Sequence, residues 1–442
     1  MSKAKRLWGI PAVFLLLAAQ ALAQSTPDEL AQKRAEQAQP RVAVAFDPPM
    51  FDKYVGYYQL GPKAIFTLSR DGNHFLARAT RQPANEIFPE SATKFFTKAF
   101  PAQISFTSDA QGQVTGLVLH QGGRETPAPR IDEALAKNIE ASVPPIGHPM
   151  PRTWPVLTRA PRFITSMTAD GGWDFWPCFS PDGKTVLFSR TPDGRNWELV
   201  RIAASGGAVQ KFARSPMPVS ATRPNWSYKT NQIAFTGTSA AGAEEIWIIN
   251  GDGTGAHAVT APELSDRMFY PSWHPDGKSL VATDGRNQML KRVNLVGGAA
   301  MAITDRARVL TGMSRVSPDG KWIAFAGQVN AGQPYDQEEN AIWLLSDAGA
   351  LTTLEAKPLQ GRTPAWSPDG RRLAFESNRG SDDGLYALFV VNRDGTGLMQ
   401  LTDYALNANH PVWSRDGRRI VFAGRERKYT NGIAIIDLPN QR

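Results

Sequence analysis

Six side chains occupy the same position of a repeated sequence pattern, and their types suit the binding of a ligand. Each stands directly before a proline, or before the serine that replaces it in one repeat, at intervals of 47, 47, 43, 50 and 47 residues. Aromatic rings, a guanidinium and an imidazole around one opening could bind a peptide, a carboxylate or a glycan. Each side chain could also do no more than pack against a neighbouring repeat. The six residues are Trp176, Arg223, Tyr270, Met313, Thr363 and His410.

Motifs of established catalytic or metal chemistry are incomplete in this sequence. Ser91–Lys94 has the Ser-x-x-Lys spacing of serine acyl-transfer enzymes, but Ser-Asp-Asn, Lys-Thr-Gly and Gly-x-Ser-x-Gly are all absent. Asn250–Gly255 and Asn392–Gly397 resemble calcium loops without the distal glutamate, so we interpret both as turns. The six histidines have no His-x-x-x-His spacing. We therefore predict no catalytic residue, no metal ligand and no cofactor, with a metal site assembled from several repeats as the alternative.

Predicted strands and turns surround the six positions and must hold them in place. The pattern from Trp366 to Phe375 contains Ser-Pro-Asp-Gly, in which proline presets the second turn residue and glycine accepts the left-handed conformation. A β-forming run follows the turn, and two more strand patterns complete the repeat. The second repeat has no glycine at its turn, so we expect Asn231 to take the left-handed position. The other copies begin at Phe179, Trp226, Trp273, Val316 and Trp413.

Four antiparallel strands repeated at this period predict the blades of a β-propeller, and six repeats predict a six-bladed ring over residues 159–442. The sixth repeat ends after its third strand. Residues 162–165, just before the first repeat, are therefore predicted to supply the missing strand and close the ring. Antiparallel connectivity places the six candidate residues at one face and the Ser-Pro-Asp-Gly turns at the other. The candidate face varies between repeats, with an acidic loop at 328–340, so we expect function there.

These repeats resemble the Pro-Asp repeats of TolB-like six-bladed propellers. The shared form, x-Pro-x-Trp-Ser-Pro-Asp-Gly-Lys-x-Ile-Ala-Phe, recurs over residues 160–442, and it is altered at Ser314 and Val316 in the fourth copy and at Arg415 in the sixth. The resemblance favours a non-enzymatic module that binds a protein or peptide, and we expect this module to be exported to the bacterial cell envelope. The alternative is a propeller enzyme, a lyase or hydrolase that acts on a polysaccharide or small molecule at the channel mouth.

The residues outside the propeller divide into a targeting segment, a small domain and two connectors. Basic residues before the apolar run 7–19, and small residues at 21–23, predict a signal peptide over 1–23 and a periplasmic or secreted protein. An uncleaved membrane anchor is the alternative. A helical tether is expected over 24–45, and a helix followed by a proline-rich linker over 132–158.

Residues 46–131 contain six strand patterns separated by polar turns, which predict a small all-β domain. Parts of it resemble the accessory domain found beside β-lactamase-like serine hydrolases and some membrane peptidases, which implies a lipocalin-like β-barrel unit without established chemistry. The predicted fold class is therefore all-β, with a smaller N-terminal barrel-like domain followed in the sequence by a six-bladed propeller. The residues that carry the likeness are Tyr54–Tyr58, Phe88–Ser91, Phe95–Phe96, Leu119–Gly123 and Arg130–Asp132.

Charge and cysteine content exclude several kinds of function. The formal net charge is +8, and removal of the three basic residues of the signal peptide lowers it to +5. No lysine- and arginine-rich cluster of the length that binds nucleic acid is present, so we predict no nucleic-acid partner. The single cysteine, Cys178, excludes intrachain disulfides and zinc clusters, and we expect it to be buried. We predict a monomer that is not an integral membrane protein once the signal is cleaved.

Overall fold

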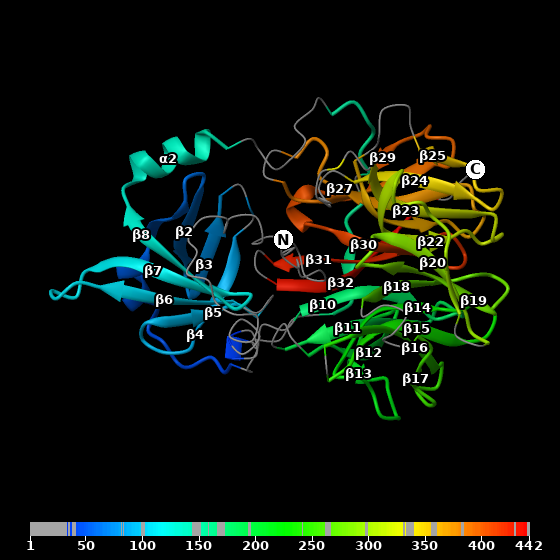
Figure 1. Cartoon of the computed structure of the whole chain (residues 1–442), viewed down its shortest axis with the longest axis horizontal. Coiled ribbons are helices and arrows are strands. Elements are labelled where there is room, and N and C mark those ends of the chain that lie inside the picture. Colours follow the sequence, from blue (N-terminus) through cyan, green and yellow to red (C-terminus); the bar gives the residue numbers. More distant parts are fainter. Residues whose placement is uncertain are drawn as a thin grey trace. The chain divides into compact units, whose positions relative to one another are not determined.

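A computed structural model describes residues 41–439 with short gaps, together with Lys33, Glu36 and Gln37. The chain forms two compact units, one with strands β1 to β8 and one with strands β9 to β32 (Figure 1). The predicted signal peptide, four of the five prolines of the predicted linker (Pro144, Pro145, Pro149 and Pro151) and the acidic side chains of the 328–340 loop lie outside the described residues. Within the described residues, no helix is both long and apolar enough to cross a membrane. The gaps are 81, 83, 99–101, 144–151, 158, 166–172, 193–195, 241, 261–266, 297–298, 330–331, 333–339, 355–359, 382–383 and 428–429.

The first unit is a closed barrel of eight antiparallel strands in sequential order. The first and last strands pair through Tyr57 opposite Ile131 and Tyr58 opposite Arg130, which closes the barrel. The predicted barrel-like β domain is thereby confirmed. Its strands are β1 (Gly56–Gly61), β2 (Ala64–Asp71), β3 (His74–Ala79), β4 (Asn85–Pro89), β5 (Lys94–Phe96), β6 (Ala102–Ser108), β7 (Val114–Gln121) and β8 (Arg124–Ile131).

Aromatic side chains form the core of this barrel. The 3-10 helix η1 (Pro48–Tyr54) buries Phe51 and Tyr54, and the Tyr54 ring stacks on Phe106 with ring centres 3.9 Å apart. The Tyr54 hydroxyl donates to the carbonyl oxygen of Ala92 at 2.8 Å, so its polar end is satisfied despite burial. The helix α2 (Glu133–Ala141) follows the last barrel strand.

Two barrel strands carry little sequence signal. The strand patterns indicate neither β4 nor β8, and both contain proline, which cannot donate to a β-ladder. Pro127 and Pro129 lie in the part of β8 that pairs only with β7, which is where a strand tolerates proline. Tyr54 belongs to η1 instead of the strand pattern that begins there.

The second unit is a six-bladed β-propeller, which confirms the predicted fold class. It contains six antiparallel sheets of four strands each. The blades are β10 (Trp173–Phe179), β11 (Thr185–Thr191), β12 (Glu198–Ala203) and β13 (Gln210–Lys211); β14 (Ser220–Trp226), β15 (Gln232–Thr238), β16 (Glu244–Asn250) and β17 (His257–Ala258); β18 (Met268–Trp273), β19 (Ser279–Asp284), β20 (Met289–Asn294) and β21 (Ala300–Ala302); β22 (Val309–Val316), β23 (Trp322–Val329), β24 (Ala341–Ser346) and β25 (Leu351–Thr353); β26 (Arg362–Trp366), β27 (Arg372–Ser377), β28 (Ala387–Asn392) and β29 (Met399–Gln400); and β30 (Asn409–Trp413), β31 (Arg419–Arg427), β32 (Thr430–Asp437) and β9 (Arg162–Phe163).

The sixth blade takes its fourth strand from the start of the propeller unit, as predicted for residues 162–165. The strand β9 pairs with β32, and the backbone N–H of Ile164 donates to the carbonyl oxygen of Ile433 at 2.8 Å. The Thr165 hydroxyl oxygen accepts a hydrogen bond from the N–H of Ile433, also at 2.8 Å. In Figure 1 the red strands β31 and β32 lie beside β10, so the last blade adjoins the first.

The threonine contact at this closure repeats a contact found inside other blades. Thr402 accepts from the N–H of Leu388 at 2.9 Å, and Thr260 accepts from the N–H of Ile246 at 2.9 Å. Each threonine follows the short fourth strand of its blade. The closing segment therefore gives the sixth blade the same internal bonding as blades that are built from one continuous stretch of chain.

The Ser-Pro-Asp-Gly turns are held by their own side chains. The Ser367 hydroxyl donates to the Asp369 carboxylate at 2.6 Å and accepts from the N–H of Arg372 at 2.9 Å. Gly370 has a φ of 67°, the left-handed conformation that glycine accepts without strain. At the turn without glycine, Asn231 has a φ of 55°, as predicted from the sequence.

Replacement of Thr165 by valine is expected to lower the free energy of unfolding by about 1–3 kcal/mol, because the N–H of Ile433 is then buried without an acceptor. Chemical denaturation followed by tryptophan fluorescence measures this change. Thr402→Val is the matched variant within a continuous blade and should lose a similar amount. If Thr402→Val is destabilised and Thr165→Val is not, residues 162–165 do not hold the ring closed.

Candidate functional site

All six candidate residues lie at the same irregularity of the innermost strands. In each blade the register between the first and second strands shifts around this residue, which marks a β-bulge. Each residue also has a left-handed φ, which costs a non-glycine residue about 1–3 kcal/mol. Because all six blades share this geometry, the fold imposes it whatever the side chain. The φ values are 52° for Trp176, 57° for Arg223, 54° for Tyr270, 26° for Met313, 47° for Thr363 and 54° for His410.

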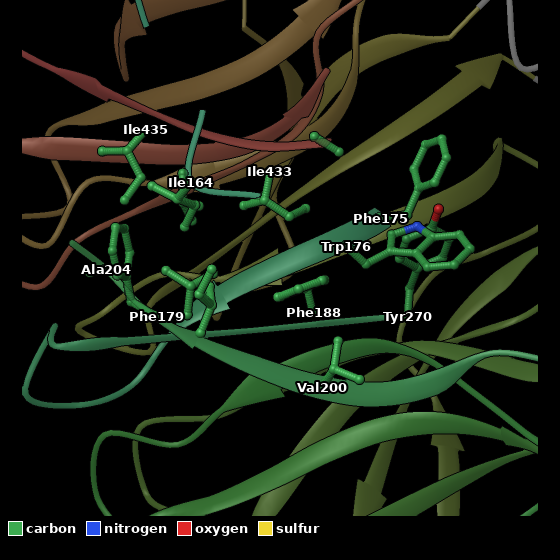
Figure 2. Packing of buried hydrophobic residues seen from close by; sticks show 14 of the residues in the cluster. Ile164, Phe175, Trp176, Phe179, Phe188, Val200, Ala204, Tyr270, Ile433 and Ile435 are labelled. Carbon is green, nitrogen blue, oxygen red and sulfur yellow. The ribbon is translucent and has the colours of Figure 1, made fainter. Parts of the chain in front are cut away.

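Four of these side chains converge on one another. The guanidinium carbon of Arg223 lies 4.9 Å from the centre of the Trp176 ring and 4.7 Å from that of Tyr270. The His410 ring centre lies 5.6 Å from Trp176 and 6.4 Å from Tyr270. Tyr270 and His410 come from the third and sixth blades, so the side chains meet across the central channel. Figure 2 shows Trp176, Tyr270 and the neighbouring Phe175 together at one end of the packed cluster.

The six residues fill the end of the channel more than they line an opening. Trp176 is 9% exposed and Arg223 is 4% exposed, while Met313 and His410 are half-buried. The cavity at this point has a volume of about 10 Å³, room for about one water molecule. Its lining consists of Trp176, Pro177, Pro224, Tyr270, Met313, Ser314, Arg315, Thr363, Pro364, His410, Pro411 and Val412.

A buried glutamate that the sequence analysis did not identify organises one side of the site. Glu376, at 1% exposure, accepts hydrogen bonds from the Thr363 hydroxyl at 2.7 Å and from the backbone N–H of His410 at 2.8 Å. Its other carboxylate oxygen pairs with Nε of Arg362 at 3.0 Å. The Glu376 carboxylate therefore holds two side chains of the fifth blade and the backbone of His410 in the sixth.

A comparison of the repeats contains a signal for Glu376. It occupies the position directly after the apolar run of the second strand, and the equivalent residues of the other five blades are small. The carboxylate is thus an exception within an otherwise regular pattern. The five equivalents are Ser189, Thr236, Thr283, Ala326 and Ala423.

The imidazole of His410 is neutral at neutral pH. Burial lowers the pKa of His410 well below its ordinary value of 6.5, and the positive charges of Arg362, Arg223 and Arg315 lower it further. Its Nδ1 lies 3.9 Å from a Glu376 carboxylate oxygen, too far for a hydrogen bond. His410 therefore contributes a neutral ring to the site.

The other motifs considered in the sequence have structural roles. The Ser91 hydroxyl accepts the backbone N–H groups of Thr93 at 3.3 Å and Lys94 at 3.1 Å, which is a turn contact. Asp252 accepts the N–H and hydroxyl of Thr254 within its own turn. Cys178 is buried, and burial raises the pKa of its thiol to about 12. Among the described residues, no group of three or more His, Cys, Asp or Glu side chains could hold a metal ion.

Known sequences match parts of the chain. A family model described as a domain of unknown function, DUF3471, matches residues 40–135, where the barrel lies. The uncharacterized protein Atu1656 of Agrobacterium fabrum is 29% identical over 131 residues, which cover 29% of this chain and 41% of that protein. The uncharacterized peptidase YuxL of Bacillus subtilis is 28% identical over 164 residues, 36% of this chain and 23% of that protein. The chain thus matches less than half the length of either relative.

Solved structures of propellers align over larger shares of the chain. TolB from Acinetobacter baumannii aligns with a TM-score of 0.44 and 16% identity over 84% of this chain and 76% of that one. Oligogalacturonate lyase from Vibrio parahaemolyticus aligns with a TM-score of 0.42 and 13% identity over 64% of this chain and 97% of that one. The sheets of the chain itself define its class, a six-bladed β-propeller protein with an N-terminal eight-stranded barrel.

Replacement of Glu376 by glutamine should lower the free energy of unfolding by about 3–5 kcal/mol, because Arg362 then loses its buried counter-charge. Urea denaturation of the purified protein measures the loss. Glu198→Gln removes an exposed ion pair with Lys211 in the same propeller and should cost less than about 1 kcal/mol. Equal effects of the two substitutions would contradict the structural role of Glu376.

The lowered pKa of His410 makes a pH-dependent contribution to stability. The unfolded chain binds a proton at this histidine near pH 6.5, and the folded protein does so only at lower pH, so stability falls as the pH drops below 6.5. The slope is at most about 1.4 kcal/mol per pH unit. Denaturation at several pH values should show a weaker pH dependence for His410→Gln than for the unmutated protein, and parallel curves would contradict a buried neutral histidine.

Proposed function

We propose that this protein is exported and that its propeller binds a protein or peptide at the cell envelope without catalysing a reaction. Binding takes place at the channel end that carries the six candidate residues. The basic residues and apolar run within residues 1–23 support export to the periplasm or the medium. The modest net charge after signal removal supports a partner other than nucleic acid.

One observation carries the proposal. All six inner strands repeat the same strained backbone at the channel, and yet the side chains at this position differ in every blade. Packing of the blades does not need these particular types, since Met313 and Thr363 occupy the same backbone position as Trp176 and Arg223. Tryptophan, tyrosine and arginine are also the residues that most often dominate binding energy at protein interfaces.

The architecture of the site favours binding over chemistry. Arg223 is held between two aromatic rings, and Glu376 is engaged by three donors, so both groups have fixed partners. A cavity of about 10 Å³ admits the tip of a ligand and not a whole small-molecule substrate. Preorganised aromatic and charged groups around a narrow entrance suit an extended ligand that inserts one end.

The second candidate function is a propeller enzyme, a lyase or hydrolase for a polysaccharide or small molecule. The observation in its favour is the neutral imidazole of His410 next to the carboxylate of Glu376, since such a pair can move protons. The YuxL relative is named as a peptidase, but the match covers less than a quarter of that protein. We therefore rank the enzyme second.

Capture from a periplasmic extract tests the proposal. The mature protein is cross-linked to its partner, the partner is purified, and its dissociation constant is measured against the unmutated protein and Arg223→Gln. We expect at least about tenfold weaker binding for the variant, since a central arginine contributes more than 1.4 kcal/mol at such sites. Arg371→Gln removes an exposed arginine from the opposite, turn face and should bind normally.

The same preparations separate binding from catalysis. Metal content is measured by elemental analysis of the unmutated protein and of His410→Gln, each checked for folding by circular dichroism. A stoichiometric metal that His410→Gln loses, with no partner captured, would overturn the binding proposal in favour of the enzyme. Loss of the captured partner in Arg371→Gln as well as Arg223→Gln would place the interaction on another surface.

A further inference from the structure

The fourth blade places an arginine at a channel position where every other blade has a shorter side chain. Arg315 stands two residues after Met313, beyond the bulge of β22 and toward the turn face. The same comparison of repeats that singles out Glu376 therefore also singles out Arg315. The equivalent residues are Cys178, Asn225, Ser272, Ala365 and Val412.

Arg315 reaches the central cavity. It lines the cavity together with Trp176, Tyr270 and His410, which come from the first, third and sixth blades. Its charge also contributes to the lowered pKa of His410, which agrees with a position near the axis. The side chain is half-buried, and residues of several other blades line the same cavity.

The guanidinium of Arg315 has no carboxylate partner among the described residues. Its Nη1 donates to the carbonyl oxygen of Ser314 at 3.0 Å, and that is its one hydrogen bond within the part of the chain that the structure describes. A guanidinium carries five N–H donors, so most of them have no protein acceptor among the described residues. A half-buried charge without a counter-charge has lost part of its hydration, which favours an anionic ligand.

A second donor points to the same conclusion independently. The indole Nε1 of Trp176 is buried and has no hydrogen-bond partner among the described residues, although Trp176 lines the same cavity. Buried indole N–H groups normally find an acceptor. Arg315 and Trp176 thus bring two kinds of donor to one small cavity, and its lining residues include no carboxylate.

The neighbouring charges leave a positive surplus at this end of the channel. Glu376 pairs with Arg362, and Glu244 is shared between Arg223 and Arg267. Together with Arg315 these residues contribute four guanidinium groups and two carboxylates, while His410 is neutral. The surplus strengthens the attraction of an anion in the poorly solvated channel.

We propose that the channel end binds the C-terminal carboxylate of a peptide, with Arg315 as its counter-charge and Trp176 as a further donor. The inference rests on the proposed peptide-binding function and specifies the chemical group that is recognised. The cavity has room for about one water molecule, so entry of the carboxylate requires the flexible side chains of Arg315 and Met313 at its wall to move aside. The last side chain of the peptide can then contact the rings of Trp176 and Tyr270. A guanidinium binds a carboxylate through two parallel hydrogen bonds, which explains the choice of arginine.

Two forms of one peptide test the proposal. Acetyl-Gly-Ala-Phe with a free C-terminus and the same peptide with a C-terminal amide are titrated calorimetrically into the full-length mature protein. We expect the free acid to bind about 10- to 100-fold more tightly than the amide, as a charge-assisted pair requires. Arg315→Gln should bind both forms equally weakly, and Arg371→Gln should keep the preference. Equal binding of acid and amide by the unmutated protein overturns the inference and leaves peptide binding in place.

A thermal measurement keeps the inference testable if neither peptide binds. Sodium formate should raise the melting temperature of the unmutated protein above its value in sodium chloride of the same concentration, because a bound anion stabilises the folded state. Arg315→Gln should show no difference between the salts. It should also melt at the same or a higher temperature than the unmutated protein in chloride, because it removes an unpaired charge. A formate effect that persists in Arg315→Gln overturns the assignment to Arg315, and no formate effect overturns the carboxylate site.

One further variant covers a failure of Arg315→Gln to fold, and one further salt distinguishes a peptide carboxylate from a sugar acid. If Arg315→Gln does not fold, Arg315→Lys keeps the charge but loses the two-pronged geometry, and it should reduce the acid-over-amide preference several-fold. Sodium galacturonate is compared with formate in the thermal assay. A larger stabilisation by galacturonate, lost in the Arg315 variant, with no preference for the peptide acid, assigns the carboxylate to a sugar acid and overturns the peptide assignment.

Discussion

The left-handed residue in each inner strand is the constraint on which the centre of the propeller depends. In an unbroken β-strand the side chains alternate between the two faces of the sheet, so each side chain of an inner strand would face a neighbouring blade. The bulge takes one residue per blade out of that alternation. Residues as far apart in the chain as Trp176, Tyr270 and His410 then meet at the channel, and their mutual packing offsets the backbone strain.

Closure of the ring also determines whether the side chains at the channel stay in contact. Trp176 belongs to the first blade and His410 to the last, so their contact crosses the one junction that β9 closes without a continuous chain. Other contacts cross the same junction, including Asn431 Nδ2 to the carbonyl oxygen of Asp174 at 3.0 Å. Pairing of β9 with β32 thus helps to keep Trp176 and His410 in contact.

Charged residues that occur in single blades determine the electrostatics of the channel. Five blades place small residues where the fifth has Glu376, and five place shorter side chains where the fourth has Arg315. The carboxylate of Glu376 accepts hydrogen bonds from residues of the fifth and sixth blades. No described carboxylate contacts Arg315. The architecture is therefore close to sixfold, but the charges are not, and that asymmetry allows one ligand to be oriented in the channel.

The sequence by itself determined the features that depend on local signals. The period of the repeats, the Ser-Pro-Asp-Gly turns, the left-handed Asn231 and the closing residues 162–165 could all be predicted, because turn chemistry and strand patterning act over a few neighbouring residues. The six candidate positions followed from that period. The barrel strands β4 and β8 did not, because proline removes the local strand signal and only pairing with neighbouring strands fixes them. Comparison of the repeats marks Glu376 and Arg315 as exceptions, but only the tertiary structure shows that the candidates fill the channel and that these two residues lie beside them. These contacts link blades through space and depend on where each side chain ends.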